Sequence, residues 1–158
     1  FQYNKKNLEK EFDSLIAGDI LITENILKYM RKRKKGLIIN VSSLWGIVAP
    51  NFKTYLDLDI GPSALTALAK AGITNYTKYI ASRDAKYLIR ANNLHPGFFP
   101  RKGPVERKDY IKSICEKIPL NRIGKLNDLI SAVEFLTSEN SNYITGQSIV
   151  VDGGYTIL

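Results

Sequence analysis

Residues 37–43 read Leu37-Ile38-Ile39-Asn40-Val41-Ser42-Ser43, and this stretch decides the fold of the chain. Its first five residues form a short, mostly apolar run, which is typical of a strand that is buried on both faces. Gly36 ends the helical pattern that precedes the run, and a predicted loop from Ser42 to Gly61 follows it. The stretch therefore predicts a strand inside a parallel sheet.

The segment before this strand predicts a helix from Asn7 to about Lys34. Asn7 is suited to cap it, and Glu9 and Glu11 place negative charge in the first turn, where the helix dipole favours it. Apolar residues recur at helical spacing, at Leu8, Phe12, Leu15, Ile16, Ile22, Ile26, Leu27 and Met30.

The segment after the loop predicts two further helix–strand units and one short helix. Pro62 suits the first turn of a second long helix, which runs to about Ser82. The remaining predicted elements are a strand at Leu88–Leu94, a short helix at Lys108–Lys117, a helix around Leu126–Leu136 and a strand at Ser148–Val151. Alternation of this kind indicates an α/β fold with parallel strands and right-handed crossovers. Ligands of such sheets bind beyond the carboxyl ends of the strands.

Composition narrows the class of protein. The 158 residues suffice for one domain, and no apolar run is long enough for a membrane span. The lone cysteine, Cys115, cannot form an internal disulfide, which fits a cytoplasmic protein. The net charge is +8, with the densest cluster at residues 31–35. These cations end a predicted helix, where they complement its dipole, and no aromatic residues interleave them, so we expect no nucleic-acid partner.

Five motifs occur in the order typical of one enzyme family. They resemble the active-site serine strand, the sixth strand with its nicotinamide-side turn, the PL-x-R-x-G segment and the carboxyl-terminal segments of short-chain dehydrogenases/reductases. The residues concerned are Ile38–Gly46, Ile89–Asn92 with His95-Pro96-Gly97, Pro119–Gly124, Phe135–Ser138, and Tyr143–Gln147 leading into Val151–Gly154. The resemblance covers essentially the whole chain. Residues 45–50 also resemble bacterial members linked to surface-sugar biosynthesis.

The resemblance implies a single partial Rossmann-like domain over residues 1–158, a doubly wound parallel sheet of which these are the last strands. We expect the amino-terminal part that binds the dinucleotide phosphates to lie outside this chain, which begins at Phe1. The resemblance also implies an NAD or NADP cofactor in the complete protein, a small-molecule carbonyl or alcohol substrate, and a homodimer or homotetramer.

Members of this family hold the substrate oxygen with a serine and transfer the proton with a tyrosine. A lysine four residues after the tyrosine binds the nicotinamide ribose and lowers the tyrosine pKa. Ser43 and Lys70 match the serine and the lysine, although a turn serine and a solvated lysine are the alternatives. The tyrosine position is Thr66, and no Tyr-x-x-x-Lys occurs in the chain. A threonine hydroxyl is a far weaker acid than a phenol, so Tyr55 in the preceding loop is a second candidate.

This chain matches some, but not all, of the other positions that are typical of the family. Val41 is expected to line the nicotinamide, and Pro96, Gly97 and Phe99 match the turn whose backbone faces its carboxamide. Arg101 replaces the usual threonine after this turn, and the family asparagine of the first helix has no counterpart, since Gly18 or Asp19 falls nearest. His95, the only histidine, is expected to pack at a strand end and not to bind a metal.

Two functions follow from these residues. The first is an NAD(P)-dependent oxidoreductase whose catalytic side this chain contains. The second is a catalytically degenerate homologue that serves as a scaffold or ligand-binding subunit, because Thr66 stands where the tyrosine is needed.

Overall fold

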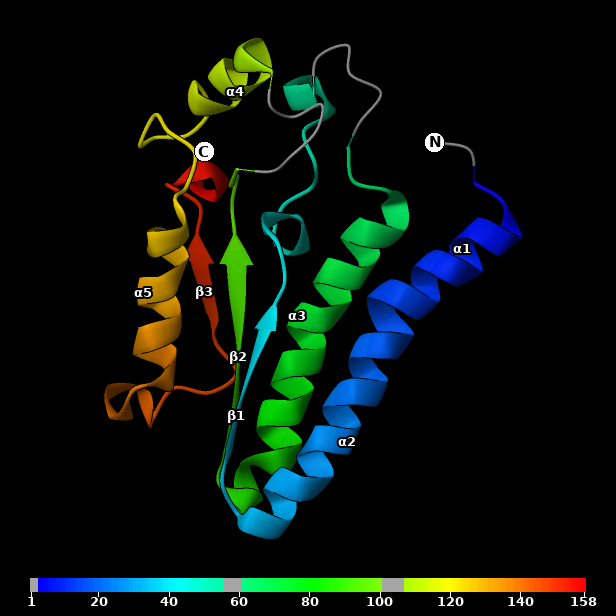
Figure 1. The fold of residues 1–158 in the computed structure, drawn as a ribbon, viewed down its shortest axis with the longest axis vertical. Helices are drawn as coiled ribbons and strands as arrows, with labels where there is room; N and C mark the ends of the chain where they lie inside the picture. The colour runs from blue at the N-terminus through cyan, green and yellow to red at the C-terminus, as the bar shows by residue number, and fades with distance from the viewer. Residues whose placement is uncertain (1–2, 56–60, 101–106) are drawn as a thin grey trace.

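The fold is a three-stranded parallel sheet flanked by helices, seen in a computed structural model that describes residues 3–55, 61–100 and 107–158. The strands are β1 (Gly36–Val41), β2 (Ile89–Pro96) and β3 (Ser148–Val151), in the spatial order β1-β2-β3. Helices α2 (Gly18–Arg33) and α3 (Ala64–Asp84) cover one side of the sheet, and α5 (Leu126–Thr137) covers the other (Figure 1). This arrangement confirms the predicted α/β class with parallel strands.

The first predicted helix is divided into α1 (Lys5–Phe12), a π-helical turn (Asp13–Ala17) and α2 (Gly18–Arg33). The prediction that Asn7 caps this helix was wrong. Asn4 is the cap, because its side-chain oxygen accepts from the backbone N–H of Asn7 at 2.9 Å and so satisfies one of the free donors of the first turn.

Helix α3 spans Ala64–Asp84, two residues later at each end than predicted. Ser63 caps it by accepting from the Thr66 N–H at 3.0 Å, so Pro62 lies before the cap and not in the first turn. The long loop before α3 contains two short 3₁₀ turns, Leu44–Gly46 and Phe52–Tyr55.

Strand β2 is longer than predicted at its carboxyl end, because β3 pairs with residues that the sequence assigned to a turn. Asn93 pairs with Ser148 and Pro96 with Val151, and the Gly97 N–H continues the ladder by donating to the Val151 carbonyl at 2.9 Å. Helix α4 spans Lys108–Cys115. None of the helices in the described part of the chain has the length and apolarity of a membrane span.

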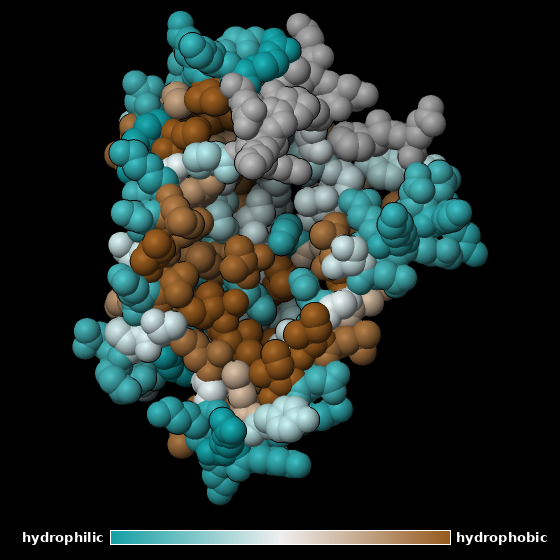
Figure 2. Space-filling model, viewed as in Figure 1, coloured by the Kyte–Doolittle hydropathy of each residue, from teal (hydrophilic) through white to brown (hydrophobic). Residues whose placement is uncertain are grey.

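Two buried clusters stabilise the fold. The first joins α2 and α3 to the sheet, and its residues are Leu27, Ile80, Ala81, Ile89 and Ala91. The second lies beyond the carboxyl ends of the strands and is largely aromatic. It contains Tyr55, Tyr110, Ile114 and Ile118, with Trp45, Phe98, Ile123 and Tyr155 packed against them. Apolar residues also spread over the face between α5 and α2 (Figure 2). Among the described residues, only β2 pairs with β1, so the other edge of β1 is open.

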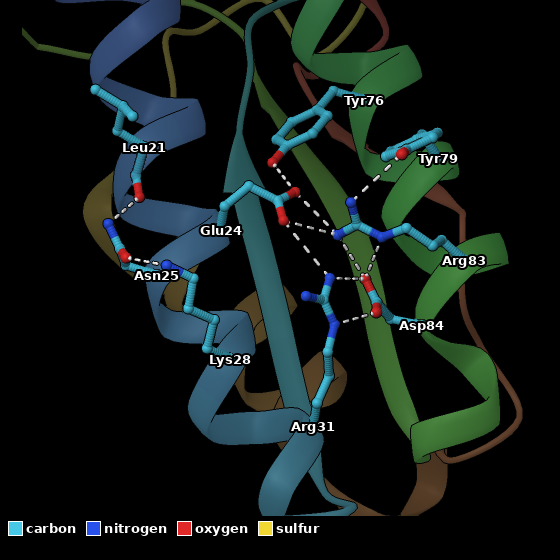
Figure 3. Close-up of polar contacts among 9 residues, drawn as sticks. All are labelled: Leu21, Glu24, Asn25, Lys28, Arg31, Tyr76, Tyr79, Arg83 and Asp84. Atoms are coloured by element: carbon cyan, nitrogen blue, oxygen red, sulfur yellow. Dashed lines mark hydrogen bonds and ion pairs between the residues drawn. The ribbon is translucent and has the colours of Figure 1, made fainter.

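A charged network ties α2 to α3 near the end of the molecule away from the carboxyl ends of the strands (Figures 1 and 3). The Asp84 carboxylate is fully buried and accepts from Arg31 Nε at 2.6 Å and from Arg83 Nη2 at 2.7 Å. Arg83 also donates to Glu24 at 2.9 Å, and the Tyr76 hydroxyl donates to the same carboxylate at 2.8 Å. Arg31 also pairs with Glu24 at 3.5 Å, so each carboxylate has cationic partners from both helices.

Candidate active site

The carboxyl end of β1 and the first half of α3 meet at the candidate site. The Lys70 ammonium donates to the Val41 carbonyl at 3.1 Å, so the predicted lysine lies at the end of the predicted strand. The Val41 side chain is 54% exposed there, although it ends a strand of partly buried residues. An apolar surface and a cation thus lie next to each other where ligands of parallel sheets bind.

Ser43 lies two residues after Val41, in extended backbone conformation, as the N-cap of the first 3₁₀ turn. Its side-chain oxygen accepts from the Trp45 N–H at 3.2 Å, and its carbonyl accepts from the Gly46 N–H at 3.0 Å. No hydrogen bond among the described residues uses the Ser43 hydroxyl as a donor, so its proton is free for a substrate oxygen.

Two polar residues that the sequence did not single out hold α3 against this strand end. The buried Ser42 hydroxyl donates to the Lys70 carbonyl at 2.8 Å, and the Thr74 hydroxyl, which donates to the same carbonyl, lies 3.3 Å away. The contact requires glycine at position 46, where a Cβ would lie 2.6 Å from the Lys70 carbonyl oxygen. The Lys70 backbone is therefore fixed relative to Ser43.

Thr66 lies one turn before Lys70 but contacts a different neighbour. Its hydroxyl donates to the Glu11 carboxylate of α1 at 3.3 Å and lies 2.9 Å from the Ser63 hydroxyl. Ser63 also donates to Glu11. No side-chain hydrogen bond of the described residues joins Thr66 to Ser43 or Lys70. The structure thus brings Lys70, Val41 and Ser43 together and turns the Thr66 hydroxyl towards α1.

Tyr55 is poorly suited to replace the missing tyrosine. Its side chain is buried in the aromatic cluster, with its ring stacked 6.1 Å from that of Tyr110. Burial, reinforced by the neighbouring phenols, raises the pKa of Tyr55 well above its usual range. A phenol with this pKa is a weaker acid than an ordinary tyrosine, and its ring is packed against other side chains.

The turn after β2 is shaped by a close approach to β3. A Cβ on Gly97 would lie 2.6 Å from the Asp152 Cα, so only glycine fits between the ends of these strands. The Phe99 ring lies against Gly124 and borders a cavity of about 770 Å³ beside α5 and β3, whose rim carries the ion pair of Arg122 and Asp128 at 2.7 Å. Arg101 lies outside the described residues.

His95 is fully buried at the end of β2, as predicted, with one ring nitrogen near Ser43 and the other near Ser148. Burial lowers the pKa of His95, the contact with the Ser43 carbonyl opposes this in part, and the nearby Lys70 charge adds a smaller lowering effect. Within the described ranges, no cluster of three histidine, cysteine or acidic residues could hold a metal ion. Asp19, one of the two residues that fall nearest the position of the family asparagine, borders a cavity of about 170 Å³ between the π-helical turn, α2 and α3.

Comparisons with known proteins identify the family of the chain. A family model described as enoyl-(acyl carrier protein) reductase matches residues 1–156. The chain is 34% identical to the 3-oxoacyl-(acyl-carrier-protein) reductase FabG of Thermotoga maritima, over 94% of this chain and 58% of the relative. It is 30% identical to the post-translational flagellin modification protein A of Campylobacter coli, over 97% of this chain and 60% of the relative.

Solved structures of related enzymes are also similar to this chain over nearly its whole length. A short-chain dehydrogenase from Leptospira borgpetersenii with bound NAD+ superposes with a TM-score of 0.87 at 31% identity, covering 98% of this chain and 58% of that chain. A gluconate 5-dehydrogenase from Burkholderia cenocepacia in complex with NADP and tartrate has a TM-score of 0.84 at 26% identity, covering 99% and 58%. The chain spans 58–60% of the length of these relatives. It belongs to the short-chain dehydrogenase/reductase family.

Proposed function

We propose that the complete protein is an NAD(P)-dependent oxidoreductase that acts on a carbonyl or alcohol substrate, with its catalytic side in this chain. The observation that carries the proposal is the arrangement at the end of β1. The Lys70 ammonium lies 3.1 Å from the Val41 carbonyl, and two residues further on the Ser43 hydroxyl donates to no acceptor in the described part of the chain. The relatives named as reductases and dehydrogenases support the same reaction class.

The residues present fit the nicotinamide end of the cofactor. The Lys70 ammonium is placed to donate to ribose hydroxyls, and the exposed Val41 side chain offers apolar surface to the ring. Pro96, Gly97 and Phe99 supply the backbone turn that closes the site beside β3, where Gly97 leaves no room for a side chain. When bound, the cofactor supplies the hydride chemistry. Neither NAD nor NADP is favoured by these residues.

The chain's own residues handle the substrate oxygen and its proton. Ser43 donates its hydroxyl proton to that oxygen as a hydrogen bond, and Lys70 adds positive charge nearby. Thr66 occupies the position of the proton donor, but an alkyl hydroxyl is a much weaker acid than a phenol, whose pKa is near 10. The Thr66 hydroxyl also already donates its proton to a hydrogen bond with Glu11. We therefore expect substrate and cofactor binding to be retained and turnover to be slow.

The biosynthetic role, the cellular location and the oligomeric state of the proposed enzyme are further parts of the proposal. Residues 45–50, which resemble those of bacterial members linked to surface-sugar biosynthesis, support a role of that kind. A cytoplasmic location is consistent with the single cysteine. The exposed apolar side chains of α1, α2 and α3 support a homodimer or homotetramer.

The experiment compares the complete wild-type protein with Ser43→Ala and Lys70→Ala. Calorimetry measures the affinity for NADH and NADPH, and absorbance follows oxidation of the reduced cofactor across a panel of ketones. We expect Ser43→Ala to reduce turnover at least roughly ten-fold with little change in cofactor affinity, and Lys70→Ala to weaken cofactor binding. Equal turnover in all three proteins would contradict the assignment.

A second function, a scaffold or ligand-binding subunit without turnover, is favoured by the Thr66 contacts. It predicts that the complete protein binds cofactor or ligand but oxidises no reduced cofactor with any ketone of the panel. Measurable wild-type turnover that depends on Ser43 excludes it.

A further inference from the structure

The His95 side chain connects all three strands at the carboxyl edge of the sheet. It belongs to β2 and is 0% exposed. Its Nδ1 lies 2.8 Å from the carbonyl oxygen of Ser43, which follows β1, and its Nε2 lies 3.1 Å from the hydroxyl of Ser148 at the start of β3. A buried polar side chain with two such partners is held in one orientation.

The two partners determine which ring nitrogen carries the proton. The Ser43 carbonyl can only accept, so Nδ1 must be the donor. In a neutral ring Nε2 then accepts from the Ser148 hydroxyl. Burial favours the neutral ring, since it lowers the pKa of His95. The contacts therefore specify the neutral tautomer protonated on Nδ1.

The carbonyl that His95 contacts belongs to the residue whose hydroxyl is proposed to hold the substrate oxygen. This carbonyl also accepts from the Gly46 N–H at 3.0 Å, while the Ser43 hydroxyl oxygen accepts from the Trp45 N–H at 3.2 Å. Three hydrogen bonds thus fix the Ser43 peptide and side chain, and only the bond from His95 comes from outside this turn.

We propose that His95 is a positioning residue, which holds the Ser43 hydroxyl in place through a hydrogen bond to the Ser43 carbonyl; the inference rests on the proposed function. His95 need not touch the substrate or exchange a proton with it. A hydroxyl that loses this support is displaced from the substrate oxygen, and a displacement of about 1 Å can cost about 10²-fold in rate.

Two substitutions separate the two contacts of the ring. An asparagine amide nitrogen occupies the place of Nδ1, so His95→Asn keeps the donor to Ser43 and loses the contact with Ser148. A glutamine amide reaches the place of Nε2, so His95→Gln keeps the contact with Ser148 and loses the donor to Ser43. Both variants replace the ring by a neutral amide, and each therefore serves as the control for the other.

The proposal is tested on the complete protein with both variants. We expect His95→Gln to have a kcat for a ketone at least about ten-fold lower than that of His95→Asn, with equal cofactor affinity. Amide exchange at Trp45 and Gly46 should be faster in His95→Gln only. A purely structural role predicts that kcat in the two variants follows their melting temperatures, and that result would overturn the proposal.

A measurement on the wild-type protein keeps the test independent of turnover and of how the variants fold. The imidazole ¹⁵N spectrum, assigned by its loss in His95→Asn or by selective labelling of this chain's single histidine, should show protonation on Nδ1 and not on Nε2. Protonation on Nε2 alone overturns the proposal. Absence of any turnover in the wild type contradicts the proposed function instead, and the spectrum together with amide exchange then decides whether His95 holds Ser43.

Discussion

Replacement of Asp84 by asparagine tests the charged network that joins α2 to α3. The Asp84 side chain is 1% exposed and receives four hydrogen bonds, two from Arg31 and two from Arg83, at 2.6–3.0 Å. Asparagine keeps the size but removes the charge, and its amide group turns two donor hydrogens towards guanidinium groups that can only donate. Oδ1 accepts one of the four bonds and Oδ2 accepts three, so one bond is lost if the amide nitrogen takes the place of Oδ1 and three are lost if it takes the place of Oδ2.

The magnitude follows from the burial of the partners. Removing one member of a buried ion pair typically costs about 3–5 kcal/mol, because the remaining charge is left uncompensated. The Arg31 and Arg83 side chains are 26% and 30% exposed, and Glu24 compensates part of their charge. Water can solvate both guanidinium groups in part, so we expect the lower end, about 3 kcal/mol. For a domain of this size that corresponds to a decrease in Tm of roughly 6–12 °C.

The pH dependence of the difference provides a second measurement. Burial alone would raise the pKa of Asp84, but the hydrogen bonds from Arg31 and Arg83 outweigh it, and the net pKa is lowered. A carboxylate with a lowered pKa in the folded state stabilises the protein above its unfolded pKa, near 3.9, and this contribution is lost as the pH falls through the folded value. The difference in Tm should be constant from pH 7 to about 5 and should decrease below about pH 4.

Thermal unfolding of the complete protein, followed by circular dichroism, measures both effects. Asp109→Asn is the matched control, because Asp109 pairs with Arg107 on the surface, where both side chains are more than half exposed. We expect this control to melt with the wild type. A Tm of Asp84→Asn within about 2 °C of the wild type at pH 7 would show that the network does not hold the helices together.

Three further predictions concern function and assembly. Thr66→Tyr in the complete protein should raise hydride transfer to a model ketone by roughly ten-fold or more, with little change in cofactor affinity, as measured by cofactor absorbance and calorimetry; a slower variant would contradict the idea that position 66 limits turnover. The isolated 158-residue chain should aggregate through the open edge of β1, and a monodisperse, cooperatively melting monomer in size-exclusion chromatography would contradict this. The complete protein should self-associate through α1, α2 and α3, where Ala69 and Gly72 line an apolar cavity, and sedimentation as a monomer at micromolar concentration would count against it.

The strands and the strand-end residues could be predicted because the information is local. Residues 37–41 and 148–151 are short apolar runs, and both form strands of the sheet as predicted. Parallel pairing then brings their carboxyl ends to one edge, which places Val41, Ser43 and the Pro96-Gly97 turn near each other without knowledge of any contact. Lys70 is identified from the family resemblance, as the lysine on the second predicted helix.

The contacts that decide the chemistry could not be predicted, because they join residues far apart in the sequence. Glu11 and Thr66 are 55 residues apart, and Ser43 and His95 are 52 apart. The amino-acid types of these four residues fit the surface of a helix or the core of a strand equally well. Their partners are determined only by the packing of α1 against α3 and of β1 against β2. The Asn4 cap was missed for a simpler reason, since Asn4 and Asn7 are both suitable caps one turn apart.

The environment of Thr66 makes its replacement a specific test of proton transfer. The first turn of α3 is held by Ser63, whose side chain accepts from the backbone N–H of residue 66, and this bond does not depend on the side chain at that position. Ser63 also donates to Glu11, so the link between α1 and α3 persists without the threonine hydroxyl. Thr66→Tyr removes both contacts of the threonine hydroxyl: the one with the Ser63 hydroxyl at 2.9 Å, and the bond to Glu11, which at 3.3 Å is longer than an ordinary O–H···O bond and correspondingly weak. Since Lys70 keeps its contacts with Val41 and Ser42, cofactor affinity should change little. A change in rate would then report the acidity and reach of the phenol, and not a rearrangement of the site.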